Sequence, residues 1–134
     1  KIYKIRYSYK KVEVYKVKTD IRIIIEGSTD FPKDLLEEMG IKVVGINVTF
    51  GEESYIGGVD IDEKAFYKRM KEEKNLPKTS SPSPDRFIEL FDCKEEEILI
   101  VTLTSKLSST YSSAVLAKSI YLENNPESNK RHMS

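Results

Sequence analysis

The sequence has few of the residues on which several common protein classes depend. Its 134 residues include one cysteine, Cys93, which excludes an internal disulfide, and one histidine, His132, near the C-terminal end. The longest apolar runs, such as residues 98–101, are far shorter than the ~20 residues that a membrane-spanning helix needs. The first residues lack the basic, apolar and small-residue order of a secretory signal. These absences predict a cytoplasmic protein with no membrane span.

The signatures of several enzyme classes are also missing. No G-x-x-x-x-G-K-[ST] phosphate loop occurs, no G-x-G-x-x-G follows a strand pattern, and no G-x-S-x-G nucleophile motif is present. No Cys/His group has the spacing of a zinc site. His132 lies in a polar tail, and Cys93 has no neighbouring His or basic cluster to activate it, so an inert, small apolar side chain is favoured there. These enzyme templates and a zinc site are therefore set aside, and an enzyme acting on a phosphorylated or acyl substrate stays an alternative that lacks a general base.

Charge is balanced overall but unevenly distributed. The first twenty residues hold seven Lys or Arg against two acidic residues, which leaves 15 basic and 20 acidic residues, a net charge of −5, in the rest. This balance gives no case for nucleic-acid binding by the main body. Within residues 1–20, apolar or aromatic residues alternate with basic ones, which indicates one or two strands. An edge hairpin whose lysines deter pairing between molecules, or a leader of foreign sequence, is favoured over a surface for single-stranded nucleic acid.

From residue 21 onward, strand and helix signals alternate. Short β-branched runs at 21–25, 41–50 and 98–103 are typical of buried strands. Amphipathic patterns between these runs predict helices, and a last helix is expected from about residue 111 to 121. The order predicts an α/β fold with a mostly parallel sheet flanked by helices. We expect three segments: a β-rich basic leader at 1–20, an α/β domain at 21–123, and a polar tail at 124–134 that looks disordered.

Residues typical of helix caps and helix ends support these helix boundaries. Gly40 suits a helix stop, Asp62 a helix N-cap, and Ser83 an N-cap followed by Pro84 at the first helical position. The segment from Gly51 to Asp60 is predicted to be a loop or a short hairpin. For Asp30, Asp60 and Asp62, cap or turn roles are expected rather than acid–base catalysis.

Hydroxyl side chains gather at two expected strand ends and in one loop. Ser28 and Thr29 follow the first run, and Ser105, Ser108 and Ser109 follow the third. The loop at 78–84 adds Thr79 and Ser80. Helix N-termini and hydroxyls at strand ends favour an anion. Capping explains each turn alone about as well, so a solvated loop stays an alternative to a site for a carboxylate or phosphate.

Several separated motifs follow one another over roughly residues 21–123. They are Gly27-Ser28-Thr29-Asp30-Phe31-Pro32, Ile46-Asn47-Val48-Thr49-Phe50-Gly51, Tyr55, Gly58-Val59-Asp60-Ile61, Phe66-Tyr67, Leu76-Pro77-Lys78-Thr79-Ser80, Pro82-Ser83-Pro84 and Ser105-Lys106-Leu107-Ser108-Ser109-Thr110-Tyr111-Ser112-Ser113-Ala114. In this order the motifs resemble the DegV family of bacterial fatty-acid-binding proteins.

The resemblance implies a long-chain fatty acid as ligand, held in an apolar tunnel of a two-domain α/β protein. It also implies a protein that is not an enzyme and has no metal or cofactor, with a separate fatty-acid kinase as partner that phosphorylates the presented carboxylate. Thr79 or Ser80, together with a serine of the 105–109 turn, is implied to bind that carboxylate. The predicted ligand-binding set is Thr79, Ser80, Ser105, Ser108 and Ser28.

Two positions depart from the family pattern, and the chain is short. Gly27 stands where the family usually has Asp, and Ser109 where it usually has Gly, so we expect Ser109 to narrow or distort the site. Family members run to about twice this length, which predicts a truncated form without the domain that closes the tunnel. The alternative prediction is a structural module without ligand, whose exposed half-core makes it a homo-oligomer.

Overall fold

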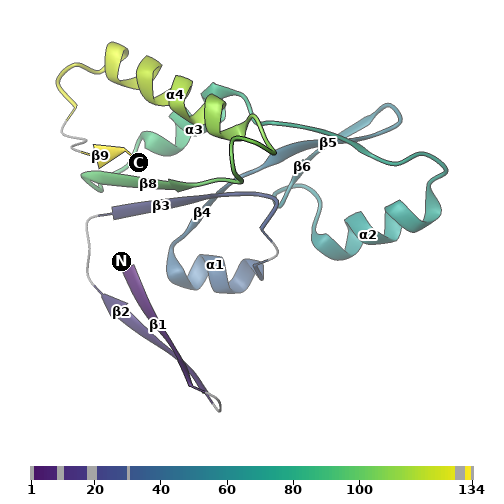
Figure 1. Cartoon of the computed structure of the whole chain (residues 1–134), viewed down its shortest axis with the longest axis horizontal. Coiled ribbons are helices and arrows are strands. Elements are labelled where there is room, and N and C mark those ends of the chain that lie inside the picture. The colour runs from purple at the N-terminus through teal and green to yellow at the C-terminus, as the bar shows by residue number, and fades with distance from the viewer. Residues whose placement is uncertain (1, 9–10, 18–20, 30, 129–131, 134) are drawn as a thin grey trace.

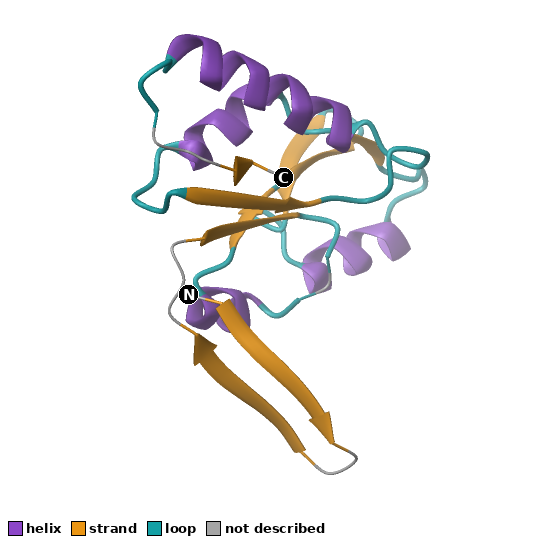
Figure 2. Cartoon of the chain, turned by 60° about the vertical axis from the view of Figure 1, so that its left-hand side comes forward, coloured by secondary structure: helices purple, strands orange, loops and turns teal. Residues whose placement is uncertain are grey.

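A four-stranded parallel sheet forms the centre of the protein. The computed structural model describes residues 2–8, 11–17, 21–29, 31–128 and 132–133. The strand order in this sheet is β4 (Lys42–Val44), β3 (Ile21–Glu26), β8 (Glu97–Val101) and β9 (His132–Met133). Helices α3 (Pro84–Phe91) and α4 (Thr110–Asn124) lie over one face, and α1 (Lys33–Met39) lies on the other side (Figures 1 and 2).

The main core lies between this sheet and the pair α3 and α4. Ile24 of β3, Ile98 of β8 and the two phenylalanines of α3, Phe87 and Phe91, are almost fully buried together. Side chains alternate between the two faces of a strand. The residues two apart from Ile24, which include Glu26, therefore share its helix-covered face.

A second, antiparallel sheet carries the helix α2 (Glu63–Glu72). Its order is β6 (Glu53–Gly57), β5 (Ile46–Phe50) and β7 (Lys78–Ser80), so β7 is an edge strand. Val48, Phe50 and Ile61 form a small core that Phe66 of α2 covers. Burial of these side chains, at roughly 25 cal/mol per Å² of apolar surface, holds the helix on the sheet.

Arg69 fastens α2 to the β5–β6 hairpin. Its guanidinium lies 4.6 Å from the Phe50 ring centroid and donates to Glu53 at 2.7 Å and Glu73 at 2.8 Å. The Tyr55 hydroxyl also donates to Glu53. The hydrogen bonds from Tyr55 and then Arg69 lower the pKa of Glu53, and the bond to Glu53 raises the pKa of Tyr55. Glu53 and Glu73 are exposed while Arg69 and Tyr55 are half-buried, so the cluster positions the helix more than it stabilises the fold.

Glycines allow the two sheets to meet. A Cβ at Gly27, just past β3, would overlap the carbonyl oxygen of Gly57 and lie 3.0 Å from the Cα of Gly45. A Cβ at Gly45 would in turn lie 2.8 Å from the same carbonyl oxygen. Gly45 is also the residue at which the chain leaves β4 and enters β5, so it passes from one sheet to the other. The close approach of backbones at Gly27 and Gly45 excludes any side chain there.

The structure confirms the predicted α/β class and the main boundaries. Gly40 is left-handed after α1, and the Asp62 carboxylate accepts the Ala65 N–H at 2.7 Å as an N-cap. Asp60 has the expected turn role, because its carboxylate accepts the Ile56 N–H at 3.0 Å. Asp30 lies outside the described residues. Pro84 begins α3 as predicted.

Several details of the sequence prediction are corrected. The run 41–50 is two strands rather than one, and of the two alternatives for 51–60 the hairpin is right, since it contains β6. Residues 78–80, expected as a loop, form β7. Ser83 occupies the N-cap position of α3, but its side chain makes no capping hydrogen bond. The tail was expected to be disordered, yet residues 132–133 pair with β8.

The first strands form a hairpin of their own. β1 (Ile2–Ser8) and β2 (Lys11–Val17) pair in antiparallel register, as the alternation predicts. Among the described residues they make a separate two-stranded sheet, not the edge of a larger one. The segment boundaries at residues 20 and 123 stay predictions. Within the described ranges, no helix has both the length and the apolar character to cross a membrane.

The glycine contact generates a stability prediction. We expect Gly27→Ala to lower the free energy of unfolding by about 2 kcal/mol, because the new methyl group meets backbone atoms that cannot rotate away. Urea denaturation followed by circular dichroism measures the change. The matched control is Gly51→Ala, where φ is +59° and nothing lies within 4 Å of the new Cβ. There the left-handed backbone alone costs roughly 1 kcal/mol. Equal losses at the two positions would contradict the close contact.

An ion pair at the opposite end of the sheet generates a pH prediction. Arg22 donates to Glu95 at 3.0 Å. Burial acts to raise the pKa of Glu95, but hydrogen bonds from its own backbone and from Arg22 outweigh it, so the pKa lies below 4.5. A lowered carboxyl pKa stabilises the fold above the unfolded value, and this stabilisation disappears as the pH falls through the folded value.

The test compares the wild type with Arg22→Met across that window. We expect the variant to be about 1 kcal/mol less stable at pH 7, and the difference to shrink below pH 4.5. Lys68→Met is the control, because the Lys68–Glu72 pair is long, at 3.9 Å, and both side chains are more than half exposed. A difference for Arg22→Met that does not depend on pH would refute the assignment.

Candidate functional site

Thr79 and Ser80 lie on opposite faces of the edge strand β7. Thr79 is directly opposite Val48 and Ser80 directly opposite Asn47 in the antiparallel pairing with β5. Residues opposite one another in such a pair share a face. Thr79 therefore lies on the α2 side of the sheet, with the buried Val48, and Ser80 on the other side with Asn47. Both are exposed, so both hydroxyls are accessible from solvent.

Asn47 organises the loop that follows β7. Its Nδ2 donates to Ser80 Oγ and to the carbonyl oxygen of Ser81, both at 3.1 Å. Ser81 Oγ then contacts Ser109 Oγ at 2.5 Å. This contact joins the β7–α3 loop to the N-cap residue of α4, which is 28 positions away in the sequence. Two hydroxyl-rich segments that the sequence keeps apart are therefore in direct contact.

A buried carboxylate lies behind the turn between β8 and α4. Glu26, at the end of β3, is 2% exposed. Its Oε2 accepts the Leu103 N–H at 2.9 Å and its Oε1 accepts the Thr110 hydroxyl at 3.0 Å. Both partners belong to the ends of the turn that carries Ser105 and Ser108. A buried carboxylate is tolerated when its oxygen atoms accept hydrogen bonds in this way.

The two predicted serines of this turn have different surroundings. Ser108 is half-buried, contacts Thr110 Oγ1 at 2.9 Å and accepts the Thr110 N–H at 3.2 Å. Ser105 is exposed, and its hydroxyl has no hydrogen-bond partner in the described part of the chain. Ser109 has a φ of −79°, so its backbone does not need glycine. The Ser109 side chain lies at the turn, where its hydroxyl hydrogen-bonds to Ser81.

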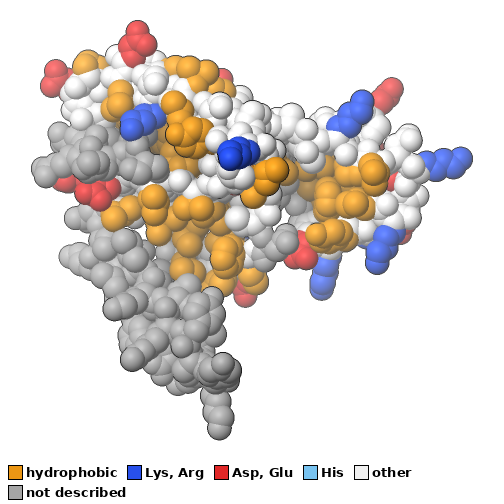
Figure 3. Space-filling view, in the orientation of Figure 1, with side chains coloured by type: hydrophobic (Ala, Val, Ile, Leu, Met, Phe, Trp, Pro, Cys, Tyr) orange, Lys and Arg blue, Asp and Glu red, His pale blue; other side chains and the backbone are white. Residues whose placement is uncertain are grey.

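Ser28 lines a groove between the β3–α1 turn, the second sheet and α2. The groove has a volume of about 680 Å³, within the range of small-molecule pockets. Its apolar wall includes Phe31, Ile46, Val48 and Phe66. Apolar side chains gather over α2 and over α1 in the space-filling view (Figure 3). This apolar wall gives an extended apolar ligand a surface to contact.

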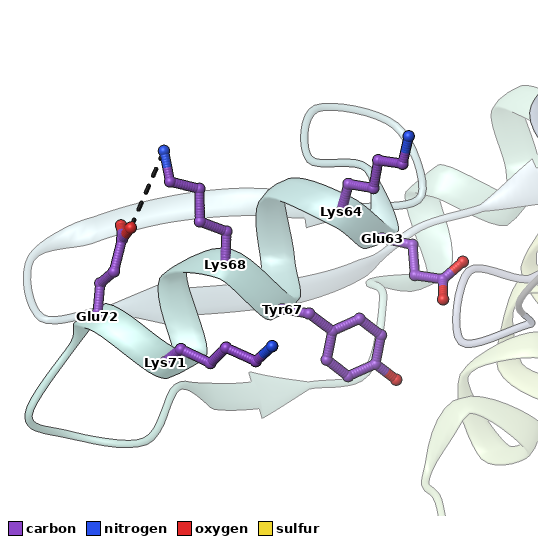
Figure 4. Close-up of a pocket in the computed structure, with 6 residues that line it drawn as sticks. All are labelled: Glu63, Lys64, Tyr67, Lys68, Lys71 and Glu72. Atoms are coloured by element: carbon purple, nitrogen blue, oxygen red, sulfur yellow. Dashed lines mark ion pairs between the residues drawn. The ribbon is translucent and has the colours of Figure 1, made fainter.

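A second hollow, of about 460 Å³, lies on the outer side of α2 (Figure 4). Lys64, Lys68 and Lys71 project from the helix around Tyr67, and among the residues drawn the ion pair is that between Lys68 and Glu72. All its lining residues come from one helix. Long, exposed side chains on one helix do not enclose a ligand, so this hollow is a solvated surface.

The predicted set thus falls into groups. The structure brings the segments of Ser80 and Ser108 together through the Ser81–Ser109 contact, while Ser28 and Thr79 belong to the groove side. It does not join all five into one hydrogen-bonded cluster. Within the described ranges, no group of three or more His, Cys, Asp or Glu is placed to hold a metal ion.

Sequence reasoning missed Glu26 and Asn47. The alternation that puts Ile24 on the helix-covered face also puts Glu26 there, and a charged residue at the end of a buried strand is a signal of a satisfied polar contact. Asn47 alternates with the buried Val48 in the same way. Their partners in the turns are not visible from the sequence.

Comparison with known proteins identifies the domain. The family model described as "Uncharacterised protein, DegV family" matches residues 20–132. The chain belongs to the DegV family. A DegV domain-containing protein of Caldanaerobacter subterraneus subsp. tengcongensis is 37% identical over 110 residues, which cover 80% of this chain and 39% of the relative.

Solved structures of similar proteins have the same fold. A stearic acid-binding protein from Eubacterium ventriosum matches with a TM-score of 0.73 at 34% identity, over 84% of this chain and 40% of that one. A DegV family protein from Ruminococcus gnavus, described with vaccenic acid, gives a TM-score of 0.74 at 26% identity, over 86% and 41%. The chain therefore spans about two-fifths of the length of the relatives it matches.

The Ser81–Ser109 bond in this DegV domain generates a stability prediction. We expect Ser109→Ala to lower the free energy of unfolding by about 1 kcal/mol, the net value of one hydrogen bond. Thermal and urea unfolding measure it. Ser105→Ala is the control, because it removes a hydroxyl without a described partner four positions earlier, and should change stability by less than about 0.5 kcal/mol. A loss for Ser109→Ala no larger than for the control would speak against the bond.

Proposed function

We propose that this DegV domain binds a long-chain fatty acid and holds its carboxylate with the hydroxyls of β7 and of the β8–α4 turn. The observation that carries the proposal is the contact of Ser81 with Ser109 at 2.5 Å, which brings the two hydroxyl-rich segments together. The fatty acids named for the related solved structures support the ligand class. The proposed ligand-binding residues are Thr79, Ser80 and Ser105 as donors to the carboxylate, Ser108 beside the head group, and Ser28 in the groove for the acyl chain.

Three of these hydroxyls have a proton free to donate to the carboxylate. A carboxylate accepts hydrogen bonds and donates none, so each protein group must offer a proton. Ser80 Oγ accepts from Asn47, which leaves its own proton available. Thr79 and Ser105 have no competing partner in the described part of the chain. The proton of Ser108 is engaged near Thr110.

The groove beside α2 is the proposed site of the acyl chain. Ser28 and Val48 both line it, and Thr79 shares a face of the sheet with Val48. Each buried CH₂ contributes ~0.8 kcal/mol, so most of the affinity comes from the tail. Because a groove covers a tail less completely than a tunnel, we expect weaker binding than a closed tunnel would give.

The biological role follows from the family resemblance. We infer an acyl carrier that presents its ligand to a fatty-acid kinase and does no chemistry itself. The side-chain hydrogen bonds of Ser80, Ser81 and Ser109 join the β7–α3 loop to Asn47 and to the start of α4. The cytoplasmic location remains a prediction.

Binding tests the proposal. We expect mass spectrometry of a lipid extract from the purified protein to detect a long-chain fatty acid, and oleate titration of the delipidated protein to saturate. Thr79→Val and Ser105→Ala should each weaken oleate binding by about tenfold, because each removes a hydrogen bond to a charged group.

The matched control is Ser112→Ala, which removes an exposed hydroxyl of α4 two residues beyond Thr110 and should leave the oleate affinity unchanged. No bound lipid and no saturable binding would refute the proposal. A molecular mass that rises with protein concentration in light scattering would then favour the oligomeric module, for which the apolar side chains Leu99, Val101 and Leu103, each at least 40% exposed, provide the surface.

A further inference from the structure

The proposed function leaves the buried pair Glu26 and Thr110 without a role. They are 2% and 0% exposed, respectively. Glu26 accepts the Leu103 N–H at 2.9 Å and the Thr110 hydroxyl at 3.0 Å. Because Leu103 precedes Ser105 and Thr110 follows Ser108, one carboxylate holds both ends of the turn that carries these serines.

The carboxylate also fixes the direction of the hydrogen bonds beyond it. A carboxylate has lone pairs but no proton, so Thr110 must donate to Glu26. Thr110 has one hydroxyl proton, and it is used in this bond. In the 2.9 Å contact between Thr110 Oγ1 and Ser108 Oγ, the donor must therefore be Ser108. The proton of Ser108 points inward, and the outer side of its oxygen is a lone pair.

We propose that Glu26 is a positioning residue that acts through Thr110 to make Ser108 a hydrogen-bond acceptor towards the bound head group, an inference that rests on the proposed function. Ser108 then lines the head-group site without donating to a carboxylate. A head group with its own proton, such as an alcohol, can donate to Ser108. Glu26 thus limits how strongly the site prefers a carboxylate over a protonated head group.

The substitution Glu26→Gln reverses the hydrogen-bond chain. The Leu103 N–H can only donate, so the new amide oxygen must face it and the amide nitrogen must face Thr110. Thr110 then accepts from the amide and donates to Ser108. Ser108 no longer has an inward acceptor, so its proton becomes available to the ligand.

The experiment measures the dissociation constants of oleate and oleyl alcohol for each variant. The two ligands have the same tail, so the contribution of tail burial to the binding free energy cancels in the ratio of their affinities. We expect Glu26→Gln to shift this ratio towards oleate by about tenfold, the size expected for one hydrogen bond to a charged group. Adding Ser108→Ala to the same variant should abolish the shift.

A second variant should also free the Ser108 proton, by a change at Thr110 instead of Glu26. Thr110→Val keeps the shape of the side chain but removes the acceptor of the Ser108 proton, so it should also shift the ratio towards oleate. Glu95→Gln is the matched control: it makes the same chemical change at a carboxylate that pairs with Arg22, far from the turn, and should leave the ratio unchanged. If Glu26 only supports the turn, Glu26→Gln lowers the affinities for oleate and for oleyl alcohol by the same factor. An unchanged ratio of the two affinities therefore overturns the inference.

A measurement without ligand separates this inference from the proposed function. Saturable oleate binding by the wild type tests the function alone. Glu26→Gln, Ser108→Ala and the double variant form a cycle for the free energy of unfolding, in which a hydrogen-bond chain through Thr110 predicts non-additive effects. Strict additivity overturns the chain even if oleate binds, and non-additivity supports it even if oleate does not.

Discussion

The close approach of two glycine backbones decides how this domain is assembled. Gly27 ends the central strand of the parallel sheet, and Gly45 begins the antiparallel one. Their Cα atoms can approach only because neither residue has a side chain, and the carbonyl oxygen of Gly57 fills the remaining space. This contact puts the end of β3 beside the start of β5. The polar residues on either side of it, Glu26 and Asn47, are thereby directed to turns that the sequence keeps far apart.

The hydroxyl-rich region is built from a buried anion outward. Glu26 is satisfied by a backbone N–H and a hydroxyl, which lets a charge remain in the interior. From there, contacts run through Thr110 and Ser108 to the surface, and a second set runs from Asn47 through Ser81 to Ser109. The two sets meet at the N-terminus of α4, where uncapped N–H groups favour negative charge. Ser109 therefore supplies the contact between the two sets.

The sequence predicted what depends on local periodicity. The helices and the parallel strands follow from the spacing of apolar residues, and caps such as Asp62 follow from side-chain chemistry next to a helix start. The split of the run 41–50 was not predictable, because Gly45 interrupts the apolar run without a turn signal and its role depends on a backbone from elsewhere. β7 was missed because three exposed residues form a strand only by pairing with β5. The residues proposed for the site could be named from motifs, but their division between two faces of β7 depends on register.

The position of Glu26 has a consequence for the order in which the domain folds. Its two partners lie 77 and 84 residues further along the chain. Contacts of such long sequence separation form only after a large loop has closed, here through the parallel pairing of β3 with β8. The turn that carries Ser105 and Ser108 thus acquires its shape late, after the central strands have found one another. Partial opening of that pairing would disorder this turn while α2 and its hairpin, whose contacts are local, remain folded.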